Sequence, residues 1–396
     1  MNYRSGLLLL ALVLGCSDPG PENPDALLLR NSALLPVEVV GNRRWSDVEA
    51  GFSHTCALTT DGEAYCWGNN YYQQTGSTAD VSCGYGERCV RTPRAVLGGH
   101  RFVQIAAGGN MSCGLTAAGA LWCWGGGFPG EGTYLGNGTL SSSTMPVRVA
   151  SDSIFTSVGR VTGGGCALTA SGQAWCWGQN SGALGDGSTT PQPSPVPIGG
   201  ALRFTRLANG SHSCGIATDA ELYCWGGNRW GQLVAGEVPF NNCCAVVTTP
   251  TRTVATGTYI DVAVGSNDFT CAIRTGGQVE CAGYNGSGVL GDNSTISHRG
   301  TLAPVAGGLV ATQVSAGIES VCVLVTDGSA YCWGENWFGG LGIGTRSDLG
   351  EGTPQRVQGG PFTKISVGGG HTCAITPTER LYCWGSDVRG AVGRGS

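Results

Sequence analysis

Cysteines are the residues of this sequence whose type and spacing most clearly suggest chemistry. Fourteen of the 19 cysteines form seven pairs, and the members of every pair stand ten positions apart. Paired cysteines can bind zinc, take part in redox exchange or form a structural disulfide. Structural zinc sites place about two to four residues between their first two ligands, and here nine intervene. The spacing therefore argues against zinc. The pairs are Cys56–Cys66, Cys113–Cys123, Cys166–Cys176, Cys214–Cys224, Cys271–Cys281, Cys322–Cys332 and Cys373–Cys383.

The sequence around the pairs is itself repeated. CALTTDGEAYCWG at residues 56–68 returns with small changes in each unit, and successive first cysteines are 48 to 57 residues apart. Repeats of about 50 residues with strand-like content are typical of propeller blades. The chain contains 69 glycines and only 12% charged residues, which favours short strands joined by tight turns. We therefore predict an all-β fold.

Each repeated stretch predicts a β-hairpin. If Cys56 lies opposite Cys66, residues 60–62 form a three-residue loop with Gly62 at the position of positive φ. Opposed residues in antiparallel strands are close enough for a disulfide, so each pair can bridge within its hairpin. Two units have Ala220 and Glu379 in place of this glycine. We expect their turns to be built differently.

Four antiparallel strands per unit match the size of a propeller blade. In the first unit, the predicted strands from the inside outward are residues 45–50, 54–59, 63–67 and 92–96. The seventh unit lacks its outer, proline-started strand, and a matching segment, LPVEVVG, occurs at residues 35–41. Pairing this segment with the last blade would close the ring and remove exposed strand edges.

These units resemble the repeats of the regulator of chromosome condensation family, which form seven-bladed β-propellers. The shared features are the His-Thr, Ala-Leu-Thr, Asp-Gly and Trp-Gly elements, followed by loops such as NRWGQL and NSGALGDGS. The resemblance covers residues 35–396. The fifth unit departs from it, with Ala282 in place of the tryptophan, so we expect looser packing in that blade.

The N-terminus has the features of an export signal. An apolar run from Gly6 to Gly15 is too short to span a bilayer, which needs about 20 residues, and it ends in Val-Leu-Gly-Cys. This segment resembles the lipobox of bacterial lipoproteins, which implies cleavage after residue 15 and acylation (palmitate) of Cys16. The predicted domains are a signal peptide at 1–15, a linker at 16–34 and the propeller at 35–396. Ser17 favours the outer membrane, on its periplasmic or outer side. An ordinary cleaved signal is the alternative.

Disulfides persist in exported proteins. Without Cys16, eighteen cysteines remain, which is an even number. Cys83 and Cys89 are expected to clamp the first long loop. Cys243 and Cys244 form a vicinal bridge or pair elsewhere.

The long loop after each Trp-Gly lies on one face of the predicted disc and varies in length, as recognition loops on rigid scaffolds do. These loops carry aromatic residues, which are enriched at binding hot spots. The alternative is that they only pin each loop to the disc. The candidates for partner binding are Tyr71, Tyr72, Phe128, Tyr134, Trp230, Phe240, Tyr284, Trp337 and Phe338.

Other classes of function find little support. The net charge is −5 without a basic run, which argues against nucleic acid as a partner. His54, His212 and His371 occupy equivalent positions, so a repeated scaffold role, such as a hydrogen bond to a neighbouring turn, is favoured over one active site. Asp47, Glu49 and Asp261 on the inner strands are expected to be isolated. The sequence predicts no catalytic residue, metal or cofactor.

The leading hypothesis is therefore an exported, lipid-anchored, monomeric scaffold. It would bind a protein or a cell-surface polymer, and touch the membrane only through its lipid. One alternative is a secreted enzyme inhibitor, as in the β-lactamase-inhibiting propeller that the units resemble. Minor alternatives are guanine-nucleotide exchange, the activity of the family's namesake, and a hydrolase or lyase in the central channel.

Overall fold

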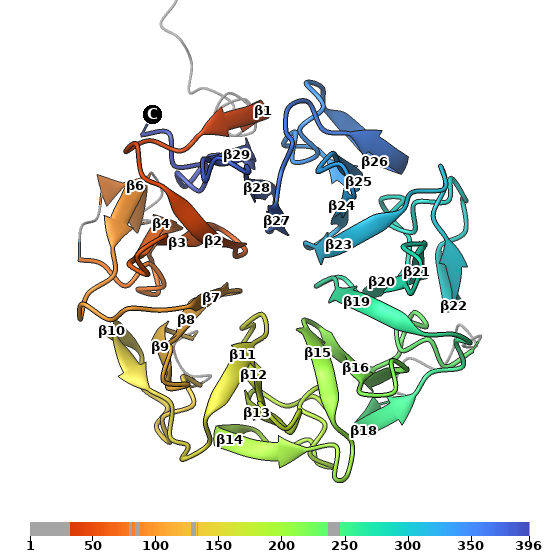
Figure 1. The fold of residues 1–396 in the computed structure, drawn as a ribbon, viewed down its shortest axis with the longest axis horizontal. Helices are drawn as coiled ribbons and strands as arrows, with labels where there is room; N and C mark the ends of the chain where they lie inside the picture. The colour runs from red at the N-terminus through yellow and green to blue at the C-terminus, as the bar shows by residue number, and fades with distance from the viewer. Residues whose placement is uncertain are drawn as a thin grey trace, which may run out of the picture.

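The chain folds as a ring of seven β-sheets, the blades of a propeller (Figure 1). The computed structural model describes residues 32–78, 81–83, 88–127, 132, 134–236 and 246–395. Each blade has four antiparallel strands, and blade 1 carries a fifth, very short one. In the part of the chain that the structure describes, no helix is long and apolar enough to cross a membrane. The predicted all-β, seven-bladed fold is confirmed.

The strands of the seven blades follow the chain in order, from the channel outward. Blade 1 has β2 (Trp45–Ala50), β3 (His54–Thr59), β4 (Ala64–Asn69), β6 (Arg88–Ala95) and the short β5 (Val81–Ser82); blade 2 has β7 (Gln104–Ala107), β8 (Met111–Leu115), β9 (Leu121–Gly125) and β10 (Ser143–Arg148). Blade 3 has β11 (Phe155–Val158), β12 (Gly164–Thr169), β13 (Ala174–Gly178) and β14 (Gln192–Ile198); blade 4 has β15 (Phe204–Asn209), β16 (His212–Ala217), β17 (Leu222–Gly227) and β18 (Val246–Arg252). Blade 5 has β19 (Tyr259–Val264), β20 (Phe269–Arg274), β21 (Val279–Tyr284) and β22 (His298–Pro304); blade 6 has β23 (Ala311–Ala316), β24 (Ser320–Val325), β25 (Ala330–Asn336) and β26 (Ser347–Arg356); blade 7 has β27 (Lys364–Val367), β28 (His371–Ile375), β29 (Leu381–Ser386) and β1 (Ser32–Glu38).

The N-terminal strand closes the ring as the sequence predicts. Strand β1 lies at the outer edge of blade 7, where it pairs antiparallel with β29 and places Val37 opposite Cys383. In Figure 1 the red β1 therefore sits beside the dark blue β29. The strand spans Ser32–Glu38, about three residues earlier than the predicted 35–41, and its register shifts between Ala33 and Val37. This pairing leaves blade 7 with the same number of strands as blades 2 to 6.

The hairpin registers agree with the predicted pairing. Cys56 lies directly opposite Cys66, and the turn is closed by a hydrogen bond from the Gly62 amide to the Thr59 carbonyl (2.9 Å), with Gly62 at φ +84°. The expectation that the two turns without glycine differ is wrong. Ala220 and Glu379 adopt φ +65° and +64°, because a single non-glycine residue in this region costs only about 1–2 kcal/mol.

Disulfides join all seven hairpin pairs, and the Cα atoms of Cys56 and Cys66 are 4.1 Å apart. Cys83 and Cys89 are also joined, with Cα atoms 5.9 Å apart, so the first long loop is clamped. Cys16, Phe128, Phe240, Cys243 and Cys244 lie outside the described residues, and the predictions made for them stay predictions.

Tryptophans on the third strands pack each blade against the long loop of the blade before it. Trp124 in blade 2 is fully buried and donates from Nε1 to the Gln74 carbonyl of blade 1 (3.1 Å). A Cβ on Gly76 of that loop would meet this indole nitrogen at 2.9 Å. In blade 4 the equivalent residue is Val234, whose amide donates to the Gly231 carbonyl (3.0 Å) as that of Gly76 does to Gln73 (3.0 Å). Val234 and Ala282 are both fully buried, and the looser packing expected for blade 5 stays a prediction.

Candidate functional site

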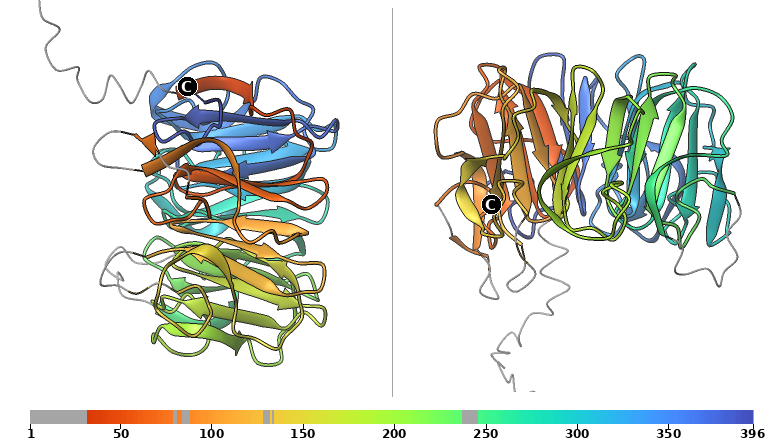
Figure 2. Two further views of the ribbon diagram at one scale, coloured as in Figure 1. Left: turned by 90° about the vertical axis from the view of Figure 1, so that its left-hand side faces the viewer. Right: turned by 90° about the horizontal axis from the view of Figure 1, so that it is seen from below.

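The long loops between the third and fourth strands of the blades, and the short turns after the inner strands, lie on one face of the disc. We call it the long-loop face, and the hairpin turns such as residues 60–62 lie on the opposite face. Figure 2 shows the disc from the side. Loop length varies most on the long-loop face, so recognition is expected there.

A buried polar residue anchors most of the long loops. Asn285 is 7% exposed; its Oδ1 accepts from the Leu290 amide (3.0 Å), and its Nδ2 donates to the Ile296 carbonyl (2.9 Å). The loop is thereby fixed at both ends. Asn285 stands two positions after the glycine that follows the third strand's Trp or Ala. The residues at this position in the loops of blades 1, 3, 4, 6 and 7 are also buried: Asn70, Asn180, Asn228, Asn336 and Asp387.

The predicted aromatic candidates fall into separate groups on this face. Tyr71 is 53% exposed and meets Tyr72 edge to face, with ring centroids 4.9 Å apart. Trp337 is 50% exposed, whereas Phe338 is half-buried. Tyr134 is half-buried beside a cavity of ≈ 230 Å³ between blades 2 and 3. The candidates thus do not form one cluster.

The largest grouping spans blades 4 to 6. The Trp230 ring of blade 4 lies 5.3 Å from the Tyr284 ring and 5.6 Å from the His298 ring of blade 5. The exposed Arg229 guanidinium lies 5.2 Å from the Trp230 ring centroid. The sequence analysis did not single out His298 or Arg229. His298 lies directly opposite Tyr284 in the β21–β22 pairing, and this strand register brings it into the grouping.

Two carboxylates extend this grouping into blade 6. Glu319 accepts hydrogen bonds from Asn267 and Ser287 of blade 5. Glu335 accepts from the backbone amide of Trp337 (2.7 Å). Burial raises the pKa of Glu335, the hydrogen bond from Trp337 opposes this, and the nearby Glu319 raises it further. We call Arg229, Trp230, Tyr284, His298, Glu319, Glu335 and Trp337 the blade 4–6 patch.

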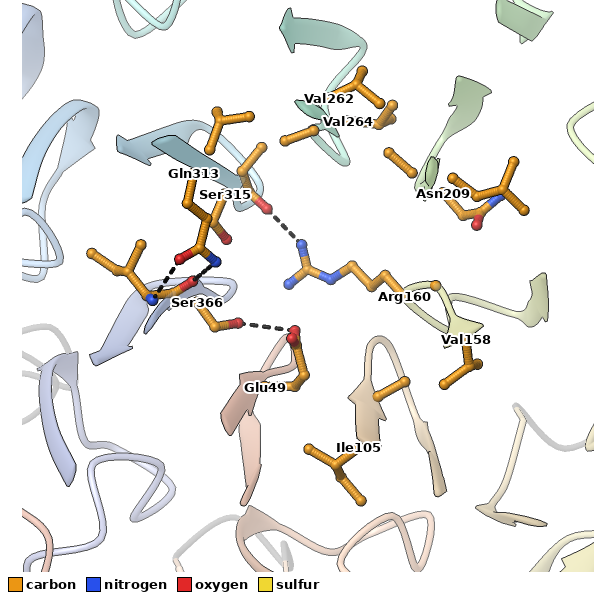
Figure 3. A pocket seen from close by; sticks show the side chains of 18 residues that line it. Glu49, Ile105, Val158, Arg160, Asn209, Val262, Val264, Gln313, Ser315 and Ser366 are labelled. Atoms are coloured by element: carbon orange, nitrogen blue, oxygen red, sulfur yellow. Dashed lines mark hydrogen bonds between the residues drawn. The ribbon is translucent and has the colours of Figure 1, made fainter. Parts of the chain in front are cut away.

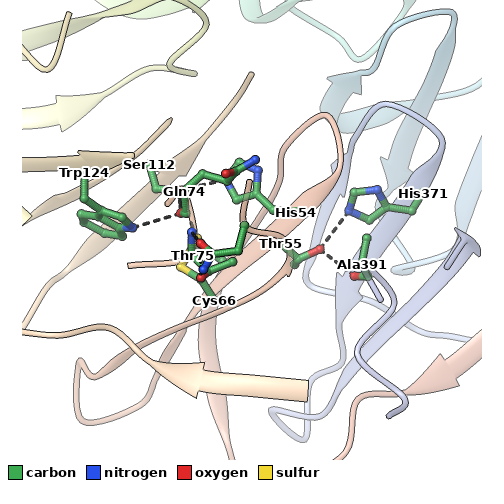
Figure 4. The surroundings of a disulfide bond; sticks show 11 residues. His54, Thr55, Cys66, Gln74, Thr75, Ser112, Trp124, His371 and Ala391 are labelled. Carbon is green, nitrogen blue, oxygen red and sulfur yellow. Dashed lines mark hydrogen bonds between the residues drawn. A yellow bond between two sulfur atoms is a disulfide. The ribbon is translucent and has the colours of Figure 1, made fainter. Parts of the chain in front are cut away.

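The three histidines of the repeat each join two blades. Each imidazole Nε2 meets a hydroxyl of the next blade, and each hydroxyl donates to a carbonyl in the long loop of the histidine's own blade. Figure 4 draws the surroundings of His54 and His371. The hydrogen of each hydroxyl is therefore committed, so the histidine Nε2 must be the donor. We call this arrangement the histidine–hydroxyl latch. The contacts are His54–Ser112 (2.9 Å) with Gln74, His212–Thr270 (2.6 Å) with Gln232, and His371–Thr55 (2.9 Å) with Ala391.

Burial governs the ionisation of these histidines. It lowers the pKa of His54 and His212 to about 3 and that of His371 to about 4. Charge on His371 and Arg160 lowers the pKa of His54 further, and Arg160 does the same for His371. The three imidazoles are neutral near pH 7. Their contacts fit a repeated scaffold role, but the partners are hydroxyls on strands of the next blade rather than the neighbouring turn that was predicted.

At two of the four blade junctions without the histidine, both ends of the latch change together. Where Met111 takes the histidine position, the next blade has Gly165 in place of the hydroxyl residue. Where Phe269 takes it, the next blade has Val321. A buried hydroxyl without a partner is costly, and at these two junctions both ends are apolar. At the other two junctions, Ser213 follows Gly164 and Thr372 follows Ser320. There each hydroxyl donates to a long-loop carbonyl, Ala183 or Gly340 (both 2.8 Å). The matched apolar pairs were readable in the sequence once the repeats were aligned.

Arg160 closes the central channel. Its guanidinium reaches across the ring to the carbonyls of Ala316 (2.6 Å), Ala50 (2.8 Å) and Val367 (2.9 Å), which end the inner strands of blades 6, 1 and 7. Figure 3 shows this side chain spanning the channel. Burial lowers the pKa of Arg160, and Glu49 opposes that shift. A cavity of ≈ 190 Å³ remains in the channel.

The inner-strand carboxylates are not isolated, contrary to the prediction for Asp47 and Glu49. Both form ion pairs with Lys364 of blade 7, at 3.2 Å for Glu49. Burial lowers the pKa of Lys364. The Asp47 and Glu49 carboxylates raise it by more than burial lowers it, so the pKa lies well above its usual range. Asp261 accepts from the Val314 amide of blade 6 (3.0 Å), and burial raises its pKa. These carboxylates hold inner strands together.

The repeat itself matches a known family. The regulator of chromosome condensation (RCC1) repeat matches residues 45–74, 311–339 and 362–391, and a second description of the same repeat matches residues 61–115 and 327–375. The chain contains regulator of chromosome condensation (RCC1) repeats. The matches fall on blades 1, 2, 6 and 7, and the remaining blades of this RCC1-repeat propeller repeat their geometry.

Two relatives match most of this chain. The Ultraviolet-B receptor UVR8 of Arabidopsis thaliana is 27% identical over 364 residues, covering 88% of this chain and 78% of the receptor. The E3 ubiquitin-protein ligase HERC2 of Homo sapiens is 29% identical over 359 residues, which are 86% of this chain but 7% of the ligase. The RCC1-repeat propeller therefore spans only a small part of that ligase. Such relatives suggest a binding or regulatory scaffold.

Solved structures show the same fold. Human WBSCR16 superposes with a TM-score of 0.73 at 19% identity, covering 89% of each chain. Prp20p of Saccharomyces cerevisiae, described with its binding properties to Gsp1p and histones, gives 0.71 at 21% identity, covering 86% of this chain and 82% of that one.

Proposed function

We propose that this RCC1-repeat propeller is an exported, lipid-anchored, non-enzymatic scaffold that binds a protein partner through its long-loop face. The observation that carries the proposal is the blade 4–6 patch, in which Trp230 packs between blades against Tyr284 and His298. Aromatic residues and arginine dominate the energetics of protein interfaces. The patch offers them together with Trp337, which is half exposed to solvent.

The patch is also held in place before any partner binds. The Trp230 amide donates to the Gln232 side chain (2.8 Å), as the Trp337 amide does to Glu335 (2.7 Å). A side chain that is already ordered loses less conformational entropy on association. Glu319 and Glu335 next to the aromatic residues add charge that would favour a partner with basic groups at its rim.

The groups best suited to acid–base chemistry are engaged elsewhere in the described residues. The three latch histidines bond to hydroxyls, and Asp47 and Glu49 bond to Lys364. This supports a binding role over a hydrolase or lyase in the channel. The yeast relative's described binding to Gsp1p and histones supports a protein as the partner class.

Capture of a partner tests the proposal. The full chain is immobilised and incubated with an envelope extract from the cells that produce it, and the bound proteins are quantified by mass spectrometry. Trp230→Ala and Trp337→Ala should each weaken capture of the partner about thirtyfold, the effect of losing an interface hot spot. Phe338→Ala, at a half-buried neighbour, should weaken it less.

The matched control is Ile154→Ala. Ile154 is 68% exposed and lies beside the Gly119 hairpin turn on the opposite face. This variant should capture the partner like the wild type. Undiminished capture by the two tryptophan variants would refute the assignment to the blade 4–6 patch.

A further inference from the structure

Blade 3 lacks both halves of the latch, and a cavity lies where its histidine would stand. The position of His54 is held here by Gly164, and the next position by Gly165. The cavity, of ≈ 210 Å³, lies between blades 3 and 4 on the long-loop face. Its polar lining comes from Thr162, Gln179, Ser181, Asn209, Ser211 and Ser213.

The local packing does not allow the missing side chains. A Cβ on Gly164 would lie 2.1 Å from the Trp177 carbonyl oxygen, and one on Gly165 would lie 2.7 Å from the Trp177 ring. The turn therefore runs so close to β13 that no side chain can project from it into the space between the blades. The cavity is a consequence of these two glycines.

Blades 3 and 4 are joined without the histidine. Ser213 donates to the Ala183 carbonyl (2.8 Å), and Asn209 Nδ2 donates to the Ser213 hydroxyl (2.9 Å). Asn209 thus supplies the donor that a histidine supplies in blades 1, 4 and 7. Because the blade junction is complete without it, the cavity is available for a ligand.

The chemistry of the lining restricts that ligand. Among the described residues, no charged side chain lines the cavity, so a charged ligand would lose its hydration with no opposite charge to compensate. Hydroxyl and amide groups dominate, and they both donate and accept hydrogen bonds. Thr162 Oγ1 and Asn209 Oδ1 are buried without a hydrogen-bond partner among the described residues. A compact molecule with several hydroxyl groups would suit this lining.

We propose that this cavity binds one neutral sugar ring. A sugar ring presents hydroxyls that donate and accept at once, and its size suits a cavity of ≈ 210 Å³. Gln179 and Ser181 are exposed, so the site is reached from solvent on the long-loop face. The site shares no residue with the blade 4–6 patch, so its test is independent of the proposed partner binding.

Saturation-transfer NMR on the full chain tests this site with D-glucose, D-galactose, D-mannose and N-acetyl-D-glucosamine as free sugars and as methyl glycosides. At least one probe should bind saturably, and the paired forms show whether a free sugar or a glycan end is preferred. Thr162→Val should weaken binding about tenfold, the effect of one hydrogen bond. Ser181→Trp, which places a large ring at the exposed rim, should abolish it.

The control is Thr363→Val, which removes an exposed hydroxyl in blade 7 and should leave binding unchanged. Thermal unfolding shows that each variant is folded, and Ser181→Trp gives the answer should Thr162→Val not fold. The proposal is overturned if no probe binds saturably, or if binding persists unchanged in the folded variants.

Discussion

His371 donates from Nε2 to the hydroxyl of Thr55, 2.9 Å away and 316 positions earlier in the chain. This contact joins the last blade to the first, and the Thr55 hydroxyl passes its own hydrogen to the Ala391 carbonyl (2.8 Å). The ring is therefore closed twice, once by strand β1 at its outer edge and once by a buried hydrogen bond nearer the channel.

The latch histidines should make the propeller sensitive to acid. Their folded pKa values of about 3 to 4 lie below the ordinary 6.5, so the unfolded chain binds more protons between these values. Their contribution is complete above pH 6.5 and is lost as the pH falls towards 4. At pH 5 each histidine should lower the free energy of unfolding by about 2 kcal/mol relative to its value above pH 6.5.

Urea unfolding between pH 4.5 and 7.5 measures this effect. A variant with His54→Gln, His212→Gln and His371→Gln keeps an N–H donor but does not titrate. Its unfolding free energy should depend on pH less steeply than that of the wild type. Equal slopes for the two proteins would contradict the assignment.

The apolar pairs at positions equivalent to the latch predict that substitutions at its two ends have non-additive effects on the free energy of unfolding. Thr270→Val alone leaves the buried His212 donor without its acceptor and should cost about 1–3 kcal/mol. His212→Phe together with Thr270→Val copies the Phe269 and Val321 pair found between blades 5 and 6. The double variant should be more stable than the sum of the single changes predicts, as measured by urea unfolding. Strict additivity would refute the latch.

Arg160 should contribute to stability through its three carbonyl contacts. Arg160→Met keeps the length of the side chain but removes every hydrogen bond, and we expect a loss of about 3 kcal/mol. Arg148→Met, at an exposed arginine, should change the unfolding free energy by less than about 0.5 kcal/mol. A similar effect of both substitutions would show that the channel contacts contribute little.

Repetition explains why so much of the fold could be predicted. Seven copies of one cysteine spacing predicted the hairpin register and the blade count, because the same evidence recurred in every unit. Ring closure was predicted from the missing outer strand of the seventh unit and the matching segment at residues 35–41. The turns at Ala220 and Glu379 were mispredicted, since a preference for glycine of about 1–2 kcal/mol is not a requirement. Local sequence indicates such conformational preferences. It does not indicate at which positions tertiary packing overrides them.

The channel could not be predicted because it gathers residues from blades far apart in the chain. Lys364 meets Asp47 across 317 positions, and nothing local to either residue indicates the other. Arg160 did leave a signal, because the equivalent positions of the other repeats hold small or uncharged residues. These are Ala50, Ala107, Asn209, Val264, Ala316 and Val367.

The lipid anchor is tested by metabolic labelling with palmitate. The wild-type chain should incorporate label and fractionate with the outer membrane, because two or more acyl chains hold a protein stably at a bilayer. Cys16→Ser should incorporate none and should leave the membrane fraction. Membrane association that survives this substitution would contradict lipidation at Cys16.

Photo-crosslinking tests partner binding at the long-loop face most directly. A benzoylphenylalanine at position 337, where half of the tryptophan surface is exposed, or at position 154 on the opposite face, is activated in intact cells. We expect one crosslinked protein from position 337 and none from position 154. Crosslinks to the same partner from position 154 alone, or none from position 337, would contradict a binding face built on the blade 4–6 patch.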